Sequence, residues 1–156
     1  MVSPRKTVLR LAVKYYKLGQ SLAKTFTVMS QKNYDLEERL VEFSSNVVDV
    51  VDALPSSSSS AALYIGNQLI RCGLAPALLY GEAQAAESRD DFIHKMKIGL
   101  KELKETRVCL KLLSRRKMAK SVELISKENE ELIAIVSKSI ETAKKNKRAT
   151  AEMRQK

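Results

Sequence analysis

Residues 89–114, RDDFIHKMKIGLKELKETRVCLKLLS, decide the fold. Their large apolar side chains recur at steps of three, four or seven residues, the spacing of one face of an α-helix: Phe92, Met96, Leu100, Leu103, Leu110 and Leu113. A second apolar strip runs beside the first: Ile93, Val108, Cys109 and Leu112. A helix that is apolar on two flanks usually has two partners. We therefore expect one partner inside the same domain and a second on a neighbouring subunit.

Three further segments carry a helical stripe of the same kind, at about 35–54, 58–84 and 121–145. In chain order their stripes are Leu36, Leu40, Phe43, Val47, Val50 or Val51 and Leu54; Ile65, Leu69, Cys72, Pro76, Leu79 and Ala83; and Val122, Ile125, Leu132, Ile133, Val136 and Ile140. Four amphipathic segments joined by short connections predict an all-α protein, an antiparallel up-down-up-down four-helix bundle.

Local signals refine the helix ends and one helix interior. Ser88 followed by Asp91 is an N-terminal signature of the capping-box kind. Pro76 lies inside its apolar stripe and removes one backbone donor, so we expect a kink or a local 3₁₀ or π adjustment near residues 72–76 without a break.

The chain divides into three parts. Residues 1–33 are predicted to be a basic helical extension, 34–145 the four-helix bundle, and 146–156 a disordered basic tail. The first part carries a stripe of its own: Val8, Leu11, Tyr15, Leu18 and Leu22. Two alternatives stay open: residues 1–28 are an extra N-terminal helix, or translation begins at Met29. Residues 1–28 resemble both an organellar presequence and a basic helix that lies on an anionic surface.

The net charge of +10 is concentrated at the two ends of the chain. Residues 1–33 hold seven basic residues and no acidic one, whereas 34–143 carry a slight negative charge. Basic ends attract polyanions without reading sequence, so we name as candidate RNA or DNA contacts Lys144, Lys145, Lys147, Arg148, Arg154, Lys156, Arg5, Lys6, Arg10, Lys14 and Lys17. No aromatic residue is interleaved in the C-terminal run, so binding should be electrostatic and weakly specific. The alternative is a solvated tail that aids solubility.

The residues that enzymes use for catalysis are scarce. His94 is the single histidine, and there is no Gly-rich phosphate loop, nucleophile elbow or CxxC motif. Cys72 and Cys109 lie among apolar neighbours and lack metal-ligand spacing, which favours reduced, packed thiols. We expect no enzyme activity, no metal and no cofactor.

The acidic residues of the bundle are predicted to be structural. Glu-x-x-His pairs, which di-metal bundles use, do not occur, so we assign structural or subunit-contact roles to Glu82, Glu87, Phe92, Glu102 and Glu105. Glu82 is predicted to pin the second core helix to the third. No apolar run approaches a membrane span, and no secretory signal is present, so a cytoplasmic location is expected.

Several runs resemble a known family. They are Asp35–Leu40, DLEERL; Gln68–Gly73, QLIRCG; Tyr80–Ser88, YGEAQAAES; Asp91–Lys97, DFIHKMK; and Leu100–Arg107, LKELKETR. Over about residues 34–147 the chain resembles the bacterial four-helix-bundle family named for proteins encoded in 23S rRNA intervening sequences. The resemblance implies a ring-like homopentamer and does not imply an enzyme. A related bundle, the accessory variability protein of diversity-generating retroelements, is a basic pentameric barrel that binds nucleic acid and a reverse transcriptase. The bundle here is slightly acidic instead, and only its ends are basic.

Three functional readings follow. The first is a non-enzymatic oligomeric bundle that binds RNA or DNA through basic surfaces and assists a nucleic-acid enzyme such as a reverse transcriptase. The second is a purely structural or protein-interaction bundle. The third, a protein of the membrane surface, rests on residues 1–28 alone.

Overall fold

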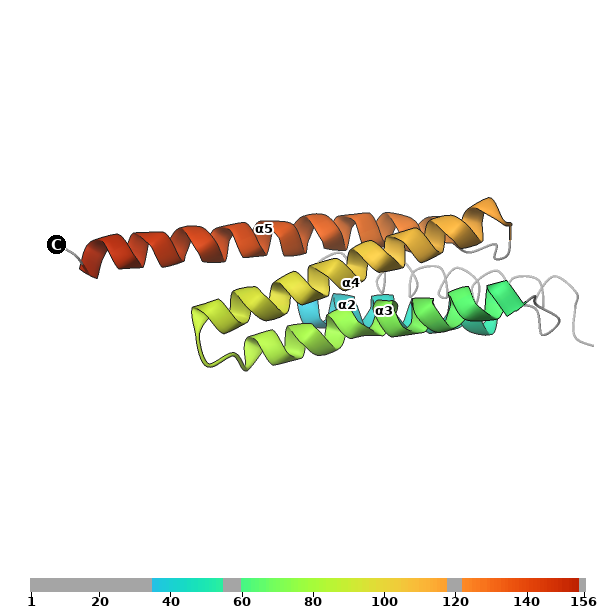
Figure 1. Ribbon diagram of the computed structural model, residues 1–156, viewed down its shortest axis with the longest axis horizontal. Coiled ribbons are helices and arrows are strands. Elements are labelled where there is room, and N and C mark those ends of the chain that lie inside the picture. The colour runs from blue at the N-terminus through green and yellow to red at the C-terminus, as the bar shows by residue number, and fades with distance from the viewer. Residues whose placement is uncertain (1–34, 55–59, 118–121, 155–156) are drawn as a thin grey trace, which may run out of the picture. The chain divides into compact units, whose positions relative to one another are not determined.

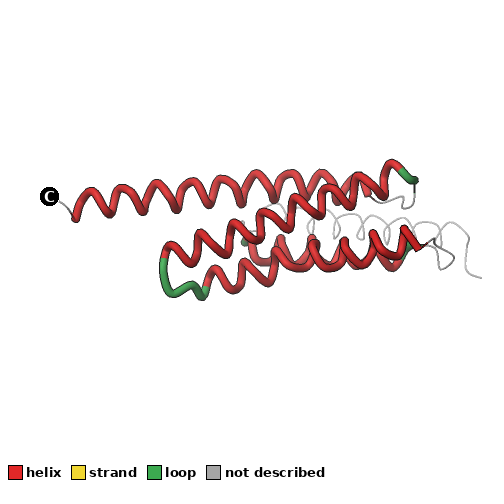
Figure 2. Tube along the Cα trace, viewed as in Figure 1, coloured by secondary structure: helices red, strands yellow, loops and turns green. Residues whose placement is uncertain are grey.

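The computed structural model describes residues 35–54, 60–117 and 122–154. Over these residues the chain forms four α-helices: α2 (Leu36–Asp52), α3 (Ser60–Gln84), α4 (Arg89–Arg115) and α5 (Val122–Arg154). Successive helices run in opposite directions, and α3 and α4 form a long hairpin (Figure 1; Figure 2). Each helix packs on its neighbours in the chain, and α5 closes the bundle by contacting α2. The predicted all-α four-helix arrangement is confirmed. The predicted N-terminal helix lies outside the described residues.

The core consists of the predicted stripes. Its most deeply buried large side chains come from all four helices: Leu40, Phe43 and Val47 of α2, Leu69 of α3, Leu103, Leu110 and Leu113 of α4, and Val122 and Leu132 of α5. Residues three and four apart on a helix share one face, so each stripe turns inward as a unit. The second strip of α4 divides: Ile93 and Cys109 are buried, while Val108 is 55% and Leu112 43% exposed.

The ends of α3 and α4 are set by local chemistry. Ser88 adopts an extended conformation and its Oγ accepts a hydrogen bond from the Asp91 backbone N–H at 3.1 Å, so the predicted N-cap is confirmed. α3 is α-helical from residue 60 to 84, with Pro76 buried inside it. Pro76 therefore does not break the helix, as predicted, and no 3₁₀ or π segment occurs near it.

Helices α2 and α3 pack closely against each other at Gly73. A Cβ atom placed on Gly73 would lie 2.7 Å from Val47 Cγ1, closer than real Cβ contacts. Ser44 Oγ lies 3.2 Å from the Gly73 carbonyl oxygen and donates to it across the same contact. The absent side chain at residue 73 is thus what lets the two backbones come this close.

A charged cluster closes the bundle between α2 and α5. Arg39 Nη2 donates to Glu128 Oε2 at 3.0 Å and also donates to Glu131. The Arg39 side chain is 20% and that of Glu128 29% exposed, so the pair is partly shielded from solvent. The hydrogen bond to Glu128 is the main reason that the pKa of Arg39 is raised above its usual value. This cluster adds to the α2–α5 contact, which is less extensive than the other three helix contacts.

The end of α5 differs from the prediction. The sequence places a disordered tail at 146–156, whereas α5 continues as one helix to Arg154. Loss of hydrophobicity after Lys144 was an incorrect criterion, because Ala, Lys, Arg, Glu and Met favour helix whether or not the helix packs on a core. The predicted boundary at residue 145 therefore falls inside a helix.

Candidate functional site

One strongly basic surface of the described chain is the last part of α5. We call residues Lys144–Arg154 of α5 the basic extension. Figure 1 shows the C-terminal end of α5 projecting beyond the α3–α4 turn. The exposed cations of the basic extension are Lys144, Lys145, Lys147 and Arg148. These four side chains are exposed, so they are accessible to a large polyanion.

One ion pair ties the basic extension to the bundle. Lys147 Nζ lies 2.6 Å from Asp90 Oδ1 and 2.7 Å from Asp90 Oδ2. Asp90 belongs to the first turn of α4, where a carboxylate also complements the helix dipole. Both side chains are more than half exposed, so the ion pair contributes little to the stability of the fold. Its main effect is to hold the basic extension against the start of α4. Lys147 is thereby neutralised locally.

Three other exposed cations of the basic extension have no ion-pair partner in the described part of the chain. Lys144, Lys145 and Arg148 form no salt bridge with any described residue. Their positive field is visible at Glu141: its pKa is lowered, first by its hydrogen bond with Lys138 and then by the charges of Lys138, Lys145 and Lys144. Anions are therefore favoured along this surface.

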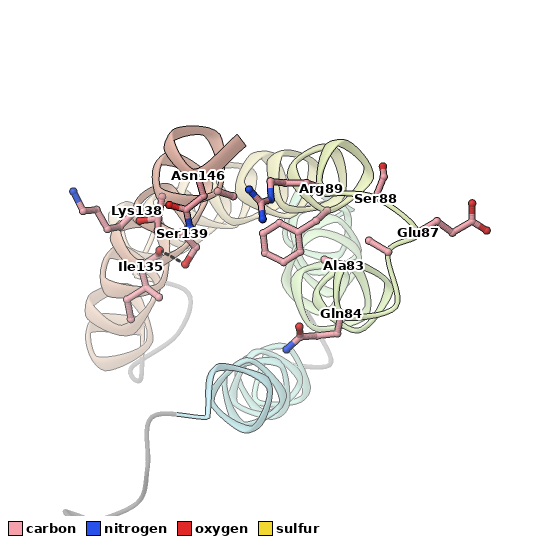
Figure 3. A pocket seen from close by; sticks show the side chains of 13 residues that line it. Ala83, Gln84, Glu87, Ser88, Arg89, Ile135, Lys138, Ser139 and Asn146 are labelled. Atoms are coloured by element: carbon pink, nitrogen blue, oxygen red, sulfur yellow. Dashed lines mark hydrogen bonds between the residues drawn. The ribbon is translucent and has the colours of Figure 1, made fainter. Parts of the chain in front are cut away.

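A groove of about 900 Å³ lies beside the basic extension (Figure 3). Its walls come from the end of α3, the α3–α4 connection, the start of α4, and α5: Ala83, Gln84, Ala86, Glu87, Ser88, Arg89, Phe92, Ile135, Lys138, Ser139, Thr142, Ala143 and Asn146. Helix α2 contributes no residue to these walls. The Ser139 hydroxyl is already used, because it donates to the Ile135 carbonyl oxygen at 3.0 Å. The charged lining residues are Arg89, Lys138 and Glu87, and Lys138 forms an ion pair with Glu141, so the groove adds little net charge to that of the basic extension.

The other predicted site residues occupy separate places. Glu82 and Lys95 Nζ are 2.6 Å apart and join α3 to α4, and this hydrogen bond raises the pKa of Lys95. Glu105 accepts from Gln68 Nε2 at 3.3 Å, which is a second α3–α4 link. Glu87 and Phe92 line the groove, and Glu102 accepts a hydrogen bond from the Thr106 hydroxyl through its backbone carbonyl.

Not all of the predicted nucleic-acid contacts fall within the described residues. Arg5, Lys6, Arg10, Lys14, Lys17 and Lys156 lie outside the described residues, and Arg154 is described only as the last residue of α5.

His94 is exposed. Within the described ranges, no three His, Cys, Asp or Glu side chains cluster as metal ligands do. Among the described helices, none combines the length and the apolarity that crossing a membrane requires.

Sequence reasoning missed two polar residues of the core. Asn129 is fully buried on α5, and its Nδ2 donates to the Leu103 carbonyl oxygen at 3.1 Å, while its Oδ1 has no hydrogen-bond partner among the described atoms. Thr106 is also fully buried. Asn129 falls between two apolar members of its stripe, Ile125 and Leu132, and that position was the available signal.

Fold and surface together define a class: a small all-α bundle with a basic helical extension. Residues 32–142 match the family of 23S rRNA-intervening sequence proteins, and the chain belongs to that family. A crystal structure of a protein of unknown function from the S23 ribosomal protein family of Bacteroides thetaiotaomicron has a similar fold, with a TM-score of 0.61 and 28% identity. The similarity covers 67% of this chain and 96% of that one. No curated protein matches the sequence.

Proposed function

We propose that this protein is a non-enzymatic, cytoplasmic, self-assembling helical bundle that binds nucleic acid, RNA in the first place, through basic surfaces. The observation that carries the proposal is the basic extension, with its uncompensated Lys144, Lys145 and Arg148. RNA is preferred to DNA because the family is named for an rRNA element. Contacts of this kind go to phosphates, so they give affinity without sequence information.

Self-assembly is supported by an exposed apolar surface shared by α3 and α4. Its members are Leu63 and Tyr64 of α3 and Val108 and Leu112 of α4, each at least 43% exposed. The Gln68–Glu105 hydrogen bond places these two stretches at the same end of the antiparallel hairpin, since all four residues lie beyond it toward that end. Clustered exposed apolar side chains mark interaction surfaces. We assign this surface to contacts between copies, in a homopentamer, as the resemblance implies.

An accessory role for a nucleic-acid enzyme such as a reverse transcriptase extends the proposal. Its support is the resemblance to the accessory variability protein. The alternative is a purely structural or protein-interaction bundle, and the apolar surface of α3 and α4 favours it, because that surface serves protein contacts whether or not nucleic acid binds.

Neutralising the basic extension should weaken RNA binding and flatten its salt dependence. We expect the triple change Lys144→Gln, Lys145→Gln and Arg148→Gln to lower affinity for a fluorescent RNA hairpin about tenfold or more at low salt. The slope of log K against log salt should fall by about 2 to 3, because each lost phosphate contact removes close to one unit. Fluorescence anisotropy over a salt series measures both quantities.

The matched control changes three exposed lysines of α4, Lys97→Gln, Lys104→Gln and Lys111→Gln, which alters net charge equally away from the extension. The proposal predicts a much smaller loss for this control. Equal slopes for the two triple variants would place the binding surface elsewhere. No binding by the unchanged protein at low salt would leave the protein-interaction alternative.

Assembly should depend on the apolar surface. We expect light scattering to give about five times the 17.5 kDa chain mass, and the pair Val108→Glu and Leu112→Glu to give a single chain mass, because buried like charges oppose association. The control is Leu78→Glu on α3, which is 69% exposed and lies beyond Gln68 toward the α3–α4 connection, away from this surface. A single chain mass for the unchanged protein contradicts self-assembly.

A further inference from the structure

The groove beside the basic extension contains an aromatic ring that phosphate binding alone does not use. Phe92 of α4 is half-buried: it packs against the core and also lines the groove. Ala83, Ile135 and Ala143 line the same groove, so part of its surface is apolar. The basic run of α5 has no aromatic residue of its own, which predicted binding without stacking on bases. The fold supplies an aromatic ring from α4 instead.

A cation and an amide lie on the rim of this groove. Arg89 is exposed, precedes Phe92 by three residues on the same face of α4, and forms no salt bridge with any described residue. Figure 3 shows the Arg89 side chain extending toward α5 and Asn146, whereas Glu87 points away from both. The Asn146 amide offers donors and an acceptor, the groups that the edge of a nucleobase pairs with.

The groove is continuous with the basic extension. Asn146 belongs to both, since it lines the groove and lies within residues 144–154 of α5. Lys145 is exposed and lies seven residues after Lys138, which also lines the groove, so the two lysines follow one edge of it. A strand whose phosphates lie along the basic extension therefore passes beside the groove, with its bases within reach of Phe92.

We propose that the groove binds one unpaired base of a single-stranded RNA, stacked on Phe92, with a neighbouring phosphate on Arg89 and the base edge hydrogen-bonded to the Asn146 amide. This rests on the proposed function, because the basic extension holds the phosphates on either side of that base. The groove volume of about 900 Å³ is ample for one base. Every base has a π-face, so the site tolerates any sequence, whereas a base stacked inside a duplex does not enter it.

Replacing Phe92 by leucine should weaken the binding of single-stranded RNA and leave the binding of duplex RNA unchanged. Leucine keeps an apolar side chain against the core and removes the ring. We expect the affinity for a short fluorescent oligouridylate to fall about fivefold or more, because one stacked base is lost. The affinities for an RNA duplex and for inorganic polyphosphate, which present phosphates without an accessible base, should not change. Fluorescence anisotropy at low salt measures the two RNAs directly and polyphosphate by competition.

The matched control is Tyr64→Leu, which removes an aromatic ring that is 74% exposed near the other end of α3 from the groove. It should leave all three affinities unchanged. If Phe92→Leu binds oligouridylate as tightly as the unchanged protein does, the base site is overturned and the proposed function stands. An equal loss for all three probes also overturns it, because the ring would then act through the fold. Absence of RNA binding by the unchanged protein overturns both.

A measurement on the unchanged full chain decides the matter even where the leucine variant folds poorly. Oligouridylate that carries one 5-iodouridine is bound to the protein and irradiated, and mass spectrometry of the digested product identifies the crosslinked residue. We expect the crosslink at Phe92, because an iodinated base couples on irradiation to an aromatic ring stacked on it. Crosslinks that form only at other residues would overturn the inference.

Discussion

Replacing Gly73 by alanine is expected to lower the free energy of unfolding by about 2 kcal/mol, although alanine is the better helix former. The new Cβ would lie 2.7 Å from Val47 Cγ1 and 2.9 Å from Val47 Cγ2. Val47 is fully buried, so it cannot move aside into solvent. Either α2 shifts away from α3 or the Val47 side chain leaves its rotamer, and both cost packing energy. Urea unfolding followed by circular dichroism measures the change.

The matched control is Gly81→Ala in the same helix. No atom lies within 4 Å of a Cβ at residue 81, so this change should raise stability by about 0.5 to 1 kcal/mol through helix propensity alone. Opposite signs for two identical substitutions are the specific result expected. If both changes stabilise the protein, the close approach of α2 and α3 at residue 73 does not exist in solution.

The helices were predicted well because one rule applies to all of them: apolar side chains recur at steps of three and four residues. Three of the four predicted segments agree with α2, α3 and α4 within about two residues, since each ends at a connection with a clear signal such as Leu54-Pro55 or Ser88. Periodicity failed for the end of α5, because a helix that leaves its core loses the apolar stripe while it keeps helical propensity. An apolar stripe indicates which face of a helix is buried, and an exposed stretch of helix has no such stripe.

Contacts between residues that are far apart in the sequence were not predicted from the sequence. Arg39 and Glu128 are 89 positions apart, and nothing local says that an arginine of α2 faces α5. The pairing of Lys147 with Asp90 depends on the length of α5, which the sequence underestimated. Pairwise register is a property of packing, and a single sequence does not encode it in any local pattern.

Helix α2 is the element whose attachment can be tested most sharply, through Phe43. It is the shortest described helix, with 17 residues, and Phe43 is its largest buried side chain, 1% exposed. Phe43→Ala should lower the free energy of unfolding by about 3 to 5 kcal/mol, since it removes a full aromatic ring from contact and leaves a cavity. Chemical denaturation measures this total.

The distribution of the loss across the molecule tells more than its size. The other buried side chains of α2 are Leu40, Val47 and Val50, so the ring is the largest of the four side chains that anchor this helix. Hydrogen exchange should therefore show α2 amides losing protection first, while α3 and α4 keep theirs through their own extensive contact. The control is Val41→Ala, two residues away and 51% exposed, which should change stability by less than about 0.5 kcal/mol. Uniform loss of protection in all four helices would mean instead that the bundle unfolds only as a whole, and that α2 is as firmly held as the hairpin it covers.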